Sequence, residues 1–123
     1  MAKILIAEDE QSVRELLSIA LRRKGHDVQT VADGSEALMA LSQERFDLLL
    51  TDIVMPVVDG IALSLKAARD DPDMRILMMT GYAAERQRAY NLEELIHDVV
   101  LKPFTMHDIG VAVEAALKGP AAA

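Results

Sequence analysis

The sequence predicts an α/β fold in which five βα units form a doubly wound parallel sheet, (βα)5. Short apolar runs of strand length alternate with segments of helical periodicity along the chain. The short runs are apolar at successive positions, which is typical of strands that a parallel sheet buries on both faces. With 123 residues, 51% of them apolar and 3% aromatic, the chain is expected to form one domain with an aliphatic core.

The predicted strands are short, and charged or turn-forming residues bound them. The first strand stops at the acids that begin with Glu8, and Pro56 and Gly60 break the chain after the third. The five predicted strands are Lys3–Ala7, Asp27–Val31, Phe46–Thr51, Arg75–Met79 and Val99–Leu101.

The segments between these strands carry the apolar spacing of amphipathic helices. The clearest runs from Val13 to Leu21, with apolar residues at i, i+3, i+4, i+7 and i+8, and Gly25 follows its basic end. Asp33 and Asp59 each precede a helix beside a glycine and are expected to cap it. The remaining predicted helices are Gly34–Leu41, Ile61–Arg69, Ala84–Leu95 and Ile109–Leu117, of which Ala84–Leu95 is only weakly periodic.

Composition excludes several classes of protein. The net charge of −7 disfavours direct binding to nucleic acid, and the absence of Cys excludes disulfides, thiol nucleophiles and Cys-ligated metals. No apolar run is long enough to span a membrane, and the acids at residue 8 come too early for a secretory signal. We therefore expect a soluble, cytoplasmic protein with one domain at 1–119 and a flexible tail at 120–123, and no output domain after it.

Polar side chains gather where the predicted strands end. Glu8 and Asp9 follow the first strand, Asp52 the third, Thr80 the fourth and Lys102 the fifth. Ligands of open α/β sheets bind beyond the carboxyl ends of the strands, so these side chains should converge. Clustered carboxylates need a neutralising cation, and oxygen ligands without Cys favour Mg²⁺.

This set of groups points to phosphoryl transfer. A carboxylate can act as the nucleophile toward phosphorus, and Asp52 is the candidate acceptor. The Thr80 hydroxyl can donate a hydrogen bond to the phosphoryl oxygens, and the Lys102 ammonium can pair with their charge. The histidines His26, His97 and His107 lack the spacing of metal ligands and are expected to have ordinary surface or packing roles.

The sequence resembles the receiver domains of two-component response regulators over Lys3–Leu117. The matching motifs are Glu8-Asp9, Asp52 through Gly60, Thr80-Gly81-Tyr82-Ala83 and Lys102-Pro103-Phe104. The resemblance implies a flavodoxin-like strand order 2-1-3-4-5, a cis Lys102–Pro103 bond and phosphorylation of Asp52 by a histidine kinase or histidine phosphotransferase. It also implies Mg²⁺ bound by Asp9, Asp52 and the backbone carbonyl of Val54, with Glu8 acting through water.

The resemblance implies a signalling protein that catalyses only its own phosphorylation and dephosphorylation, within a phosphorelay. The sequence is most similar to stand-alone receivers that serve as adaptors for a AAA+ unfoldase-protease of the Clp type. Such a protease is therefore an expected partner, and neither nucleic acid nor a membrane is expected to be one. Val99 occupies the family's aromatic switch position, so a ring cannot move inward there when Thr80 moves. Val54 cannot position an attacking water and Tyr82 is bulky, which favours slow loss of phosphate.

Other functions stay open from the sequence. A phosphatase of the haloacid-dehalogenase type also uses Asp, Mg²⁺, Thr and Lys, but its nucleophile belongs to an Asp-x-Asp motif, whereas Ile53 and Val54 follow Asp52. A flavodoxin-like electron carrier would need a Ser-, Thr- and Gly-rich phosphate loop after the first strand. A phosphorylation-independent scaffold, or a stand-alone receiver acting on a kinase or motor, is the non-enzymatic alternative.

Overall fold

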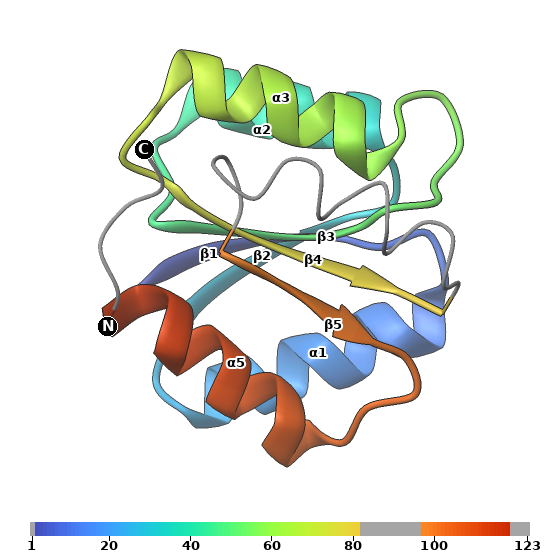
Figure 1. Ribbon diagram of the computed structural model, residues 1–123, viewed down its shortest axis with the longest axis vertical. Helices are drawn as coiled ribbons and strands as arrows, with labels where there is room; N and C mark the ends of the chain where they lie inside the picture. Colours follow the sequence, from blue (N-terminus) through green and yellow to red (C-terminus); the bar gives the residue numbers. More distant parts are fainter. Residues whose placement is uncertain (1, 82–96, 119–123) are drawn as a thin grey trace.

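The computed structural model describes residues 2–81 and 97–118, and in this part five parallel strands form one sheet in the order β2-β1-β3-β4-β5. Helices α1 and α5 cover one face of the sheet, and α2 and α3 cover the other (Figure 1). The predicted fold class and strand order are therefore confirmed. The elements are β1 (Lys3–Ala7), α1 (Gln11–Arg23), β2 (Asp27–Val31), α2 (Gly34–Gln43), β3 (Leu48–Asp52), α3 (Gly60–Asp70), β4 (Arg75–Thr80), β5 (Asp98–Leu101) and α5 (Met106–Lys118).

Most boundaries agree with the prediction to within two or three residues. The largest difference in a strand is at β3, which begins at Leu48 and not at Phe46. Phe46 is buried in the core like a strand residue, but it precedes the ladder, which pairs Leu48 with Ile4 of β1. The predicted helix Ala84–Leu95, the side chain of Tyr82 and the tail at 120–123 lie outside the described residues.

Two aliphatic clusters form the core, one on each face of the sheet. Alternation along β4 divides neighbouring residues between them, since Met78 packs in the cluster under α2 and α3 and Met79 in the cluster under α1 and α5. Both methionines are fully buried, as expected for core residues. Val99 belongs to the same cluster as Met78 and is 6% exposed. Among the described residues, no helix is long and apolar enough to cross a bilayer.

The helices that begin near the end of the sheet are capped as predicted. The Asp33 carboxylate accepts a hydrogen bond from the Glu36 N–H at the start of α2, and Asp59 accepts one from the Ala62 N–H at the start of α3. Each cap satisfies a backbone donor that the first helical turn leaves unpaired.

The strand register brings the carboxyl ends of the central strands to one edge of the sheet. Ala7 lies opposite Thr51, Asp52 opposite Met79, and Thr80 opposite Leu101. Residues that directly follow β1 and β5 therefore lie beside the last residue of β3.

Candidate functional site

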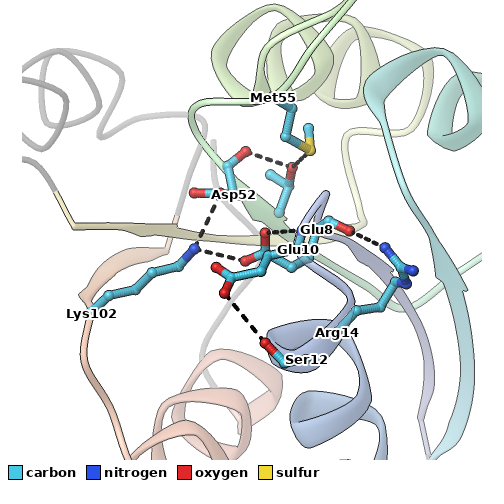
Figure 2. Close-up of polar contacts among 8 residues, drawn as sticks. Glu8, Glu10, Ser12, Arg14, Asp52, Met55 and Lys102 are labelled. Carbon is cyan, nitrogen blue, oxygen red and sulfur yellow. Dashed lines mark hydrogen bonds and ion pairs between the residues drawn. The ribbon is translucent and has the colours of Figure 1, made fainter.

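Three of the predicted site residues form a connected ionic cluster at the carboxyl edge of the sheet. Lys102 extends from the end of β5 toward Asp52 at the end of β3 and Glu8 after β1, as Figure 2 shows. Its Nζ lies 2.7 Å from Glu8 Oε1 and 3.2 Å from Asp52 Oδ2. The Glu8 side chain is 0% exposed, that of Asp52 10% and that of Lys102 23%. Asp52 is thus mostly buried, with a small part of its side chain exposed.

Asp9 adds a third carboxylate to this cluster. Glu8, Asp9 and Asp52 each offer an oxygen, and the three oxygens lie within 4.8 Å of one another. Asp9 is exposed, so the group opens to solvent on one side. A close set of hard oxygen donors with a net negative charge fits a divalent cation of the Mg²⁺ type. Val54, two residues beyond Asp52, contributes an exposed side chain to the adjoining loop.

Burial dominates the electrostatics of the two inner carboxyl groups. It raises the pKa of Glu8 and of Asp52 above their ordinary values, although Lys102 acts in the opposite direction on both. The negative charge of Asp9 raises the pKa of Asp52 further. Burial alone would lower the pKa of Lys102, but the hydrogen bond and charge of Glu8, together with Asp52, raise it overall. The three carboxylates of the cluster also outnumber its one ammonium, so the cluster is deficient in positive charge.

Further hydrogen bonds hold the inner acids, and sequence reasoning missed the residue that makes one of them. Glu8 Oε2 accepts a hydrogen bond from the Glu10 N–H at 3.1 Å, and Arg14 Nη1 donates to the Glu8 carbonyl at 2.8 Å. Thr51 Oγ1 donates to the Asp52 carbonyl at 2.9 Å. Arg14 lies in the first turn of α1, six positions after Glu8. This position at the start of the helix is the one signal in the sequence that could have indicated its contact with Glu8.

Thr80 lies at the same edge, fully buried at the end of β4. The Lys102 N–H donates to the Thr80 carbonyl at 2.8 Å, so the backbone of the two residues is joined beside the cluster. The Lys102–Pro103 bond is cis, as predicted.

The loop from Ile53 to Asp59 closes tightly on the backbone of Asp52. The Gly60 N–H donates to the Ile53 carbonyl at 2.7 Å, and a Cβ on Gly60 would lie 2.0 Å from the Asp52 carbonyl oxygen. Only glycine permits this approach. A Cβ on Gly34, at the start of α2, would likewise lie 2.1 Å from the carbonyl oxygen of Val58 in this loop.

Other polar groups lie apart from the site. Of the histidines, His26 accepts a hydrogen bond from the Ala2 N–H and lies at the other end of the sheet. In the part of the chain that is described, Glu8, Asp9 and Asp52 are the one acidic or histidine group with metal-binding geometry. A groove of about 560 Å³ lies between the ends of α2 and α3 beside Phe46, Lys66 and Met74, away from Glu8, Asp9 and Asp52.

Comparison with known proteins agrees with this fold and identifies the family. The response regulator receiver domain family matches residues 4–114. The chain belongs to this family.

The relatives include both receivers of similar length and longer proteins. The chain is 39% identical to the response regulator receiver protein CpdR of Brucella abortus, over 95% of this chain and 98% of that protein. It is 35% identical to the regulatory protein PhoP of Bacillus subtilis, but spans 48% of that protein's length.

Solved structures share the fold closely. A CheY-like receiver domain from Methanospirillum hungatei has a TM-score of 0.88 and 28% identity, covering 95% of this chain and 94% of that one. TrrA from Thermotoga maritima, solved in complex with Mg²⁺-BeF, has a TM-score of 0.86 and 28% identity, covering 95% and 100%.

Proposed function

We propose that this receiver accepts a phosphoryl group on Asp52 from a histidine kinase or histidine phosphotransferase in a Mg²⁺-dependent reaction. The observation that carries the proposal is the joint contact of Lys102 with Asp52 and Glu8 in a site where Asp52 keeps an exposed edge. A purely structural ion pair would need one carboxylate, whereas this cluster holds three, two of which contact the Lys102 ammonium. The excess negative charge suits a site that recruits a cation before it reacts.

The transfer itself needs few groups. A carboxylate oxygen of Asp52 attacks phosphorus, a P–O bond forms, and the P–N bond to the donor imidazole breaks. The bonding electrons return to that nitrogen. The imidazole leaves as a neutral ring, because it carries a proton on its other nitrogen or takes one from solvent. Lys102 pairs with the negative charge of the transferred oxygens, and the Thr80 hydroxyl donates to them.

Asp9, Asp52 and the Val54 carbonyl would hold the Mg²⁺ ion, with Glu8 acting through water. When bound, the ion supplies positive charge that offsets the carboxylates and the phosphoryl oxygens. Glu8 also fixes the Lys102 ammonium within reach of Asp52 through their 2.7 Å contact. The chain's own residues would thus position two positive charges, the Lys102 ammonium and the Mg²⁺ ion, beside the acceptor oxygen of Asp52.

The output we propose is a protein–protein contact, with a Clp-type AAA+ unfoldase-protease as the partner. The likeness to CpdR over nearly the whole of both chains supports a receiver that acts through its own surface. Val99 is small and buried in the core, so no aromatic side chain at this position can transmit the signal. Movement of Thr80 would have to reach the surface through backbone and packing changes.

Capture of the partner tests this function. Immobilised wild type and Asp52→Ala are each offered a purified Clp-type unfoldase, with and without acetyl phosphate and Mg²⁺. We expect capture by the wild type to change with the phosphodonor and capture by Asp52→Ala to stay constant. Asp73→Ala, which removes an exposed acid far from the site, is the matched control and should behave like the wild type.

Two results would contradict the proposal. Equal capture of the unfoldase with and without acetyl phosphate, in every variant, would indicate a phosphorylation-independent scaffold. Phosphorylation without any capture of the unfoldase would exclude the adaptor role and leave a receiver with another target, such as a kinase or motor.

A further inference from the structure

The groove between the ends of α2 and α3 lies at the edge of the sheet opposite the acid cluster. α2 ends at Gln43 and α3 at Asp70, and Phe46 and Met74, which precede β3 and β4, line the groove. This edge is away from the arrowheads of β4 and β5 in Figure 1. β3 has five residues, so about 16 Å of strand separates the two edges. The groove therefore has no part in the chemistry proposed for Asp52.

The apolar residues of the groove are incompletely covered by the fold. Phe46 and Met74 are buried, whereas Leu38 and Leu41 of α2 are only half-buried, although both pack against the core cluster under α2 and α3. An apolar side chain placed against the two leucines would remove their remaining surface from water, which favours binding. The volume of about 560 Å³ lies in the range of ligand pockets in proteins and has room for several side chains.

The rim of the groove carries more negative than positive charge. Four of the lining residues are acids and two are bases, namely Glu44, Asp70, Asp71, Asp73, Arg45 and Lys66. Both helices also end at this rim, and the last carbonyl groups of a helix carry partial negative charge. The groove therefore attracts cations and repels anions such as nucleotides.

Asp73 is the acid of this rim whose charge is not paired within the described residues. The other three rim acids each belong to an ion pair, Lys3–Glu44, Lys66–Asp70 or Arg45–Asp71. The backbone of Asp73 is held, since its N–H donates to Asp71 Oδ1 at 3.2 Å and its carbonyl accepts from Arg75 Nη1 at 3.3 Å. Its exposed carboxylate is thus fixed at the rim, where a cation can bind it without breaking an existing ion pair.

We infer that this groove binds a segment of a partner protein in which a large aliphatic side chain lies near an arginine or lysine. The aliphatic side chain would pack against Leu38 and Leu41, and the basic group would pair with Asp73. An apolar centre inside a polar rim is the usual arrangement of a protein–protein interface. A second copy of this chain is a poor occupant, because the net charge of −7 makes two copies repel each other.

The partner in the groove is distinct from the unfoldase, and this part of the inference rests on the proposed function. Capture of the unfoldase should change with the phosphodonor, so the surface that binds it must respond to Asp52. The groove is at the other end of β3, at the edge that holds none of the acid cluster. Binding in the groove should therefore be equal with and without acetyl phosphate.

Selection from a random heptapeptide library displayed on phage, with the full chain as bait, tests the chemistry of the groove. We expect the enriched peptides to combine Leu, Ile or Met with Arg or Lys. The most enriched sequence is then synthesised and titrated into the protein. Backbone NMR shifts should change near Leu41, Phe46 and Met74 and not near Asp52. Raising the salt concentration should weaken binding, because part of the attraction is between exposed charges.

Three variants assign the binding energy of this peptide. Asp73→Asn should weaken its Kd about threefold, as for one exposed ion pair, and should melt like the wild type. Leu41→Ala should weaken the Kd about fivefold through lost apolar contact, and Asp73→Asn still decides the inference if this variant does not fold. Glu114→Gln removes an exposed acid of α5, on the other face of the sheet, and as the matched control should leave the Kd unchanged.

Each contrary outcome overturns part or all of the inference. Enriched peptides without a basic residue, shifts centred outside the groove, or an unchanged Kd for Asp73→Asn would show that the groove does not bind such a segment. Self-association that Asp73→Asn abolishes would make a second copy the occupant. A Kd that changes with acetyl phosphate, or altered capture of the unfoldase by Asp73→Ala, would overturn the separate partner. Failure of Asp52 to accept phosphate would refute the proposed function and leave peptide binding in the groove intact, which is a distinct result.

Discussion

Replacing Gly60 with alanine is expected to lower the free energy of unfolding by about 3 kcal/mol, the upper part of the range for overpacking. The added methyl group would lie 2.0 Å from the Asp52 carbonyl oxygen and 2.9 Å from the Ile53 Cα. Both are backbone atoms, so neither can move without displacing the end of β3 or the start of α3. Urea unfolding followed by circular dichroism measures the loss.

Gly110 supplies the matched control. It lies within α5, and a Cβ there would approach only the Lys24 Cε, at 3.4 Å, which is the far end of a flexible side chain. Gly110→Ala should stabilise the protein by up to about 1 kcal/mol, because alanine favours helix. If Gly60→Ala unfolds at the same urea concentration as the wild type, the close packing of the loop on Asp52 is wrong.

Replacing Lys102 with methionine should destabilise the metal-free protein by about 3 kcal/mol, the lower end of the range for a broken buried pair. The loss arises because two mostly buried carboxylates, Glu8 and Asp52, would no longer have an ammonium to pair with. The Glu8 side chain has no exposed surface, so water cannot replace that ammonium. The partial exposure of Lys102 places the value at the low end. Saturating Mg²⁺ should restore part of the stability, since the cation replaces the missing charge.

The pH dependence of this loss follows from the carboxyl pKa values. The folded protein raises the pKa of Glu8 and Asp52, so their ionisation lowers stability as the pH rises through those raised values. Without Lys102 both pKa values should rise further. The difference between wild type and Lys102→Met should therefore shrink as the pH falls from neutral toward about 4, where carboxyl groups protonate.

Lys66→Met is the matched control for charge removal. Lys66 forms an exposed i,i+4 ion pair with Asp70 at 3.1 Å. Its loss should cost no more than about 0.5 kcal/mol at any of these pH values. Equal losses for both lysine variants would contradict the account of a charge-deficient acid cluster.

Sequence patterns sufficed for the fold because the chain's local preferences agree with its tertiary structure. Runs apolar on both faces predicted the buried parallel strands, and the residues that end those runs predicted the edge where the acids meet. Phe46 shows the limit of this reasoning, since burial gave it the appearance of a strand residue although the ladder begins at Leu48. Hydrophobicity reports burial, whereas pairing decides the strand boundary.

Features that depend on long-range geometry were not predictable. The positions of Glu8, Asp52 and Lys102 at the ends of predicted strands indicated that they converge, but not that the Lys102 ammonium lies closer to Glu8 than to Asp52. The hydrogen bond from Arg14 to the Glu8 carbonyl and the contact of Gly60 with Asp52 depend on how α1 and α3 start. Val57 has a φ of 71°, which β-branched residues disfavour, so no propensity argument could place this conformation.

The most direct test of the central claim is the intact mass of the protein after incubation with acetyl phosphate. In Mg²⁺ the wild type should gain the mass of one phosphoryl group, and peptide mapping should place it on Asp52. EDTA should abolish the gain, and Asp52→Ala should show none under either condition. Label that persists in Asp52→Ala, or that forms equally well in EDTA, would contradict a Mg²⁺-dependent phosphoacceptor at Asp52.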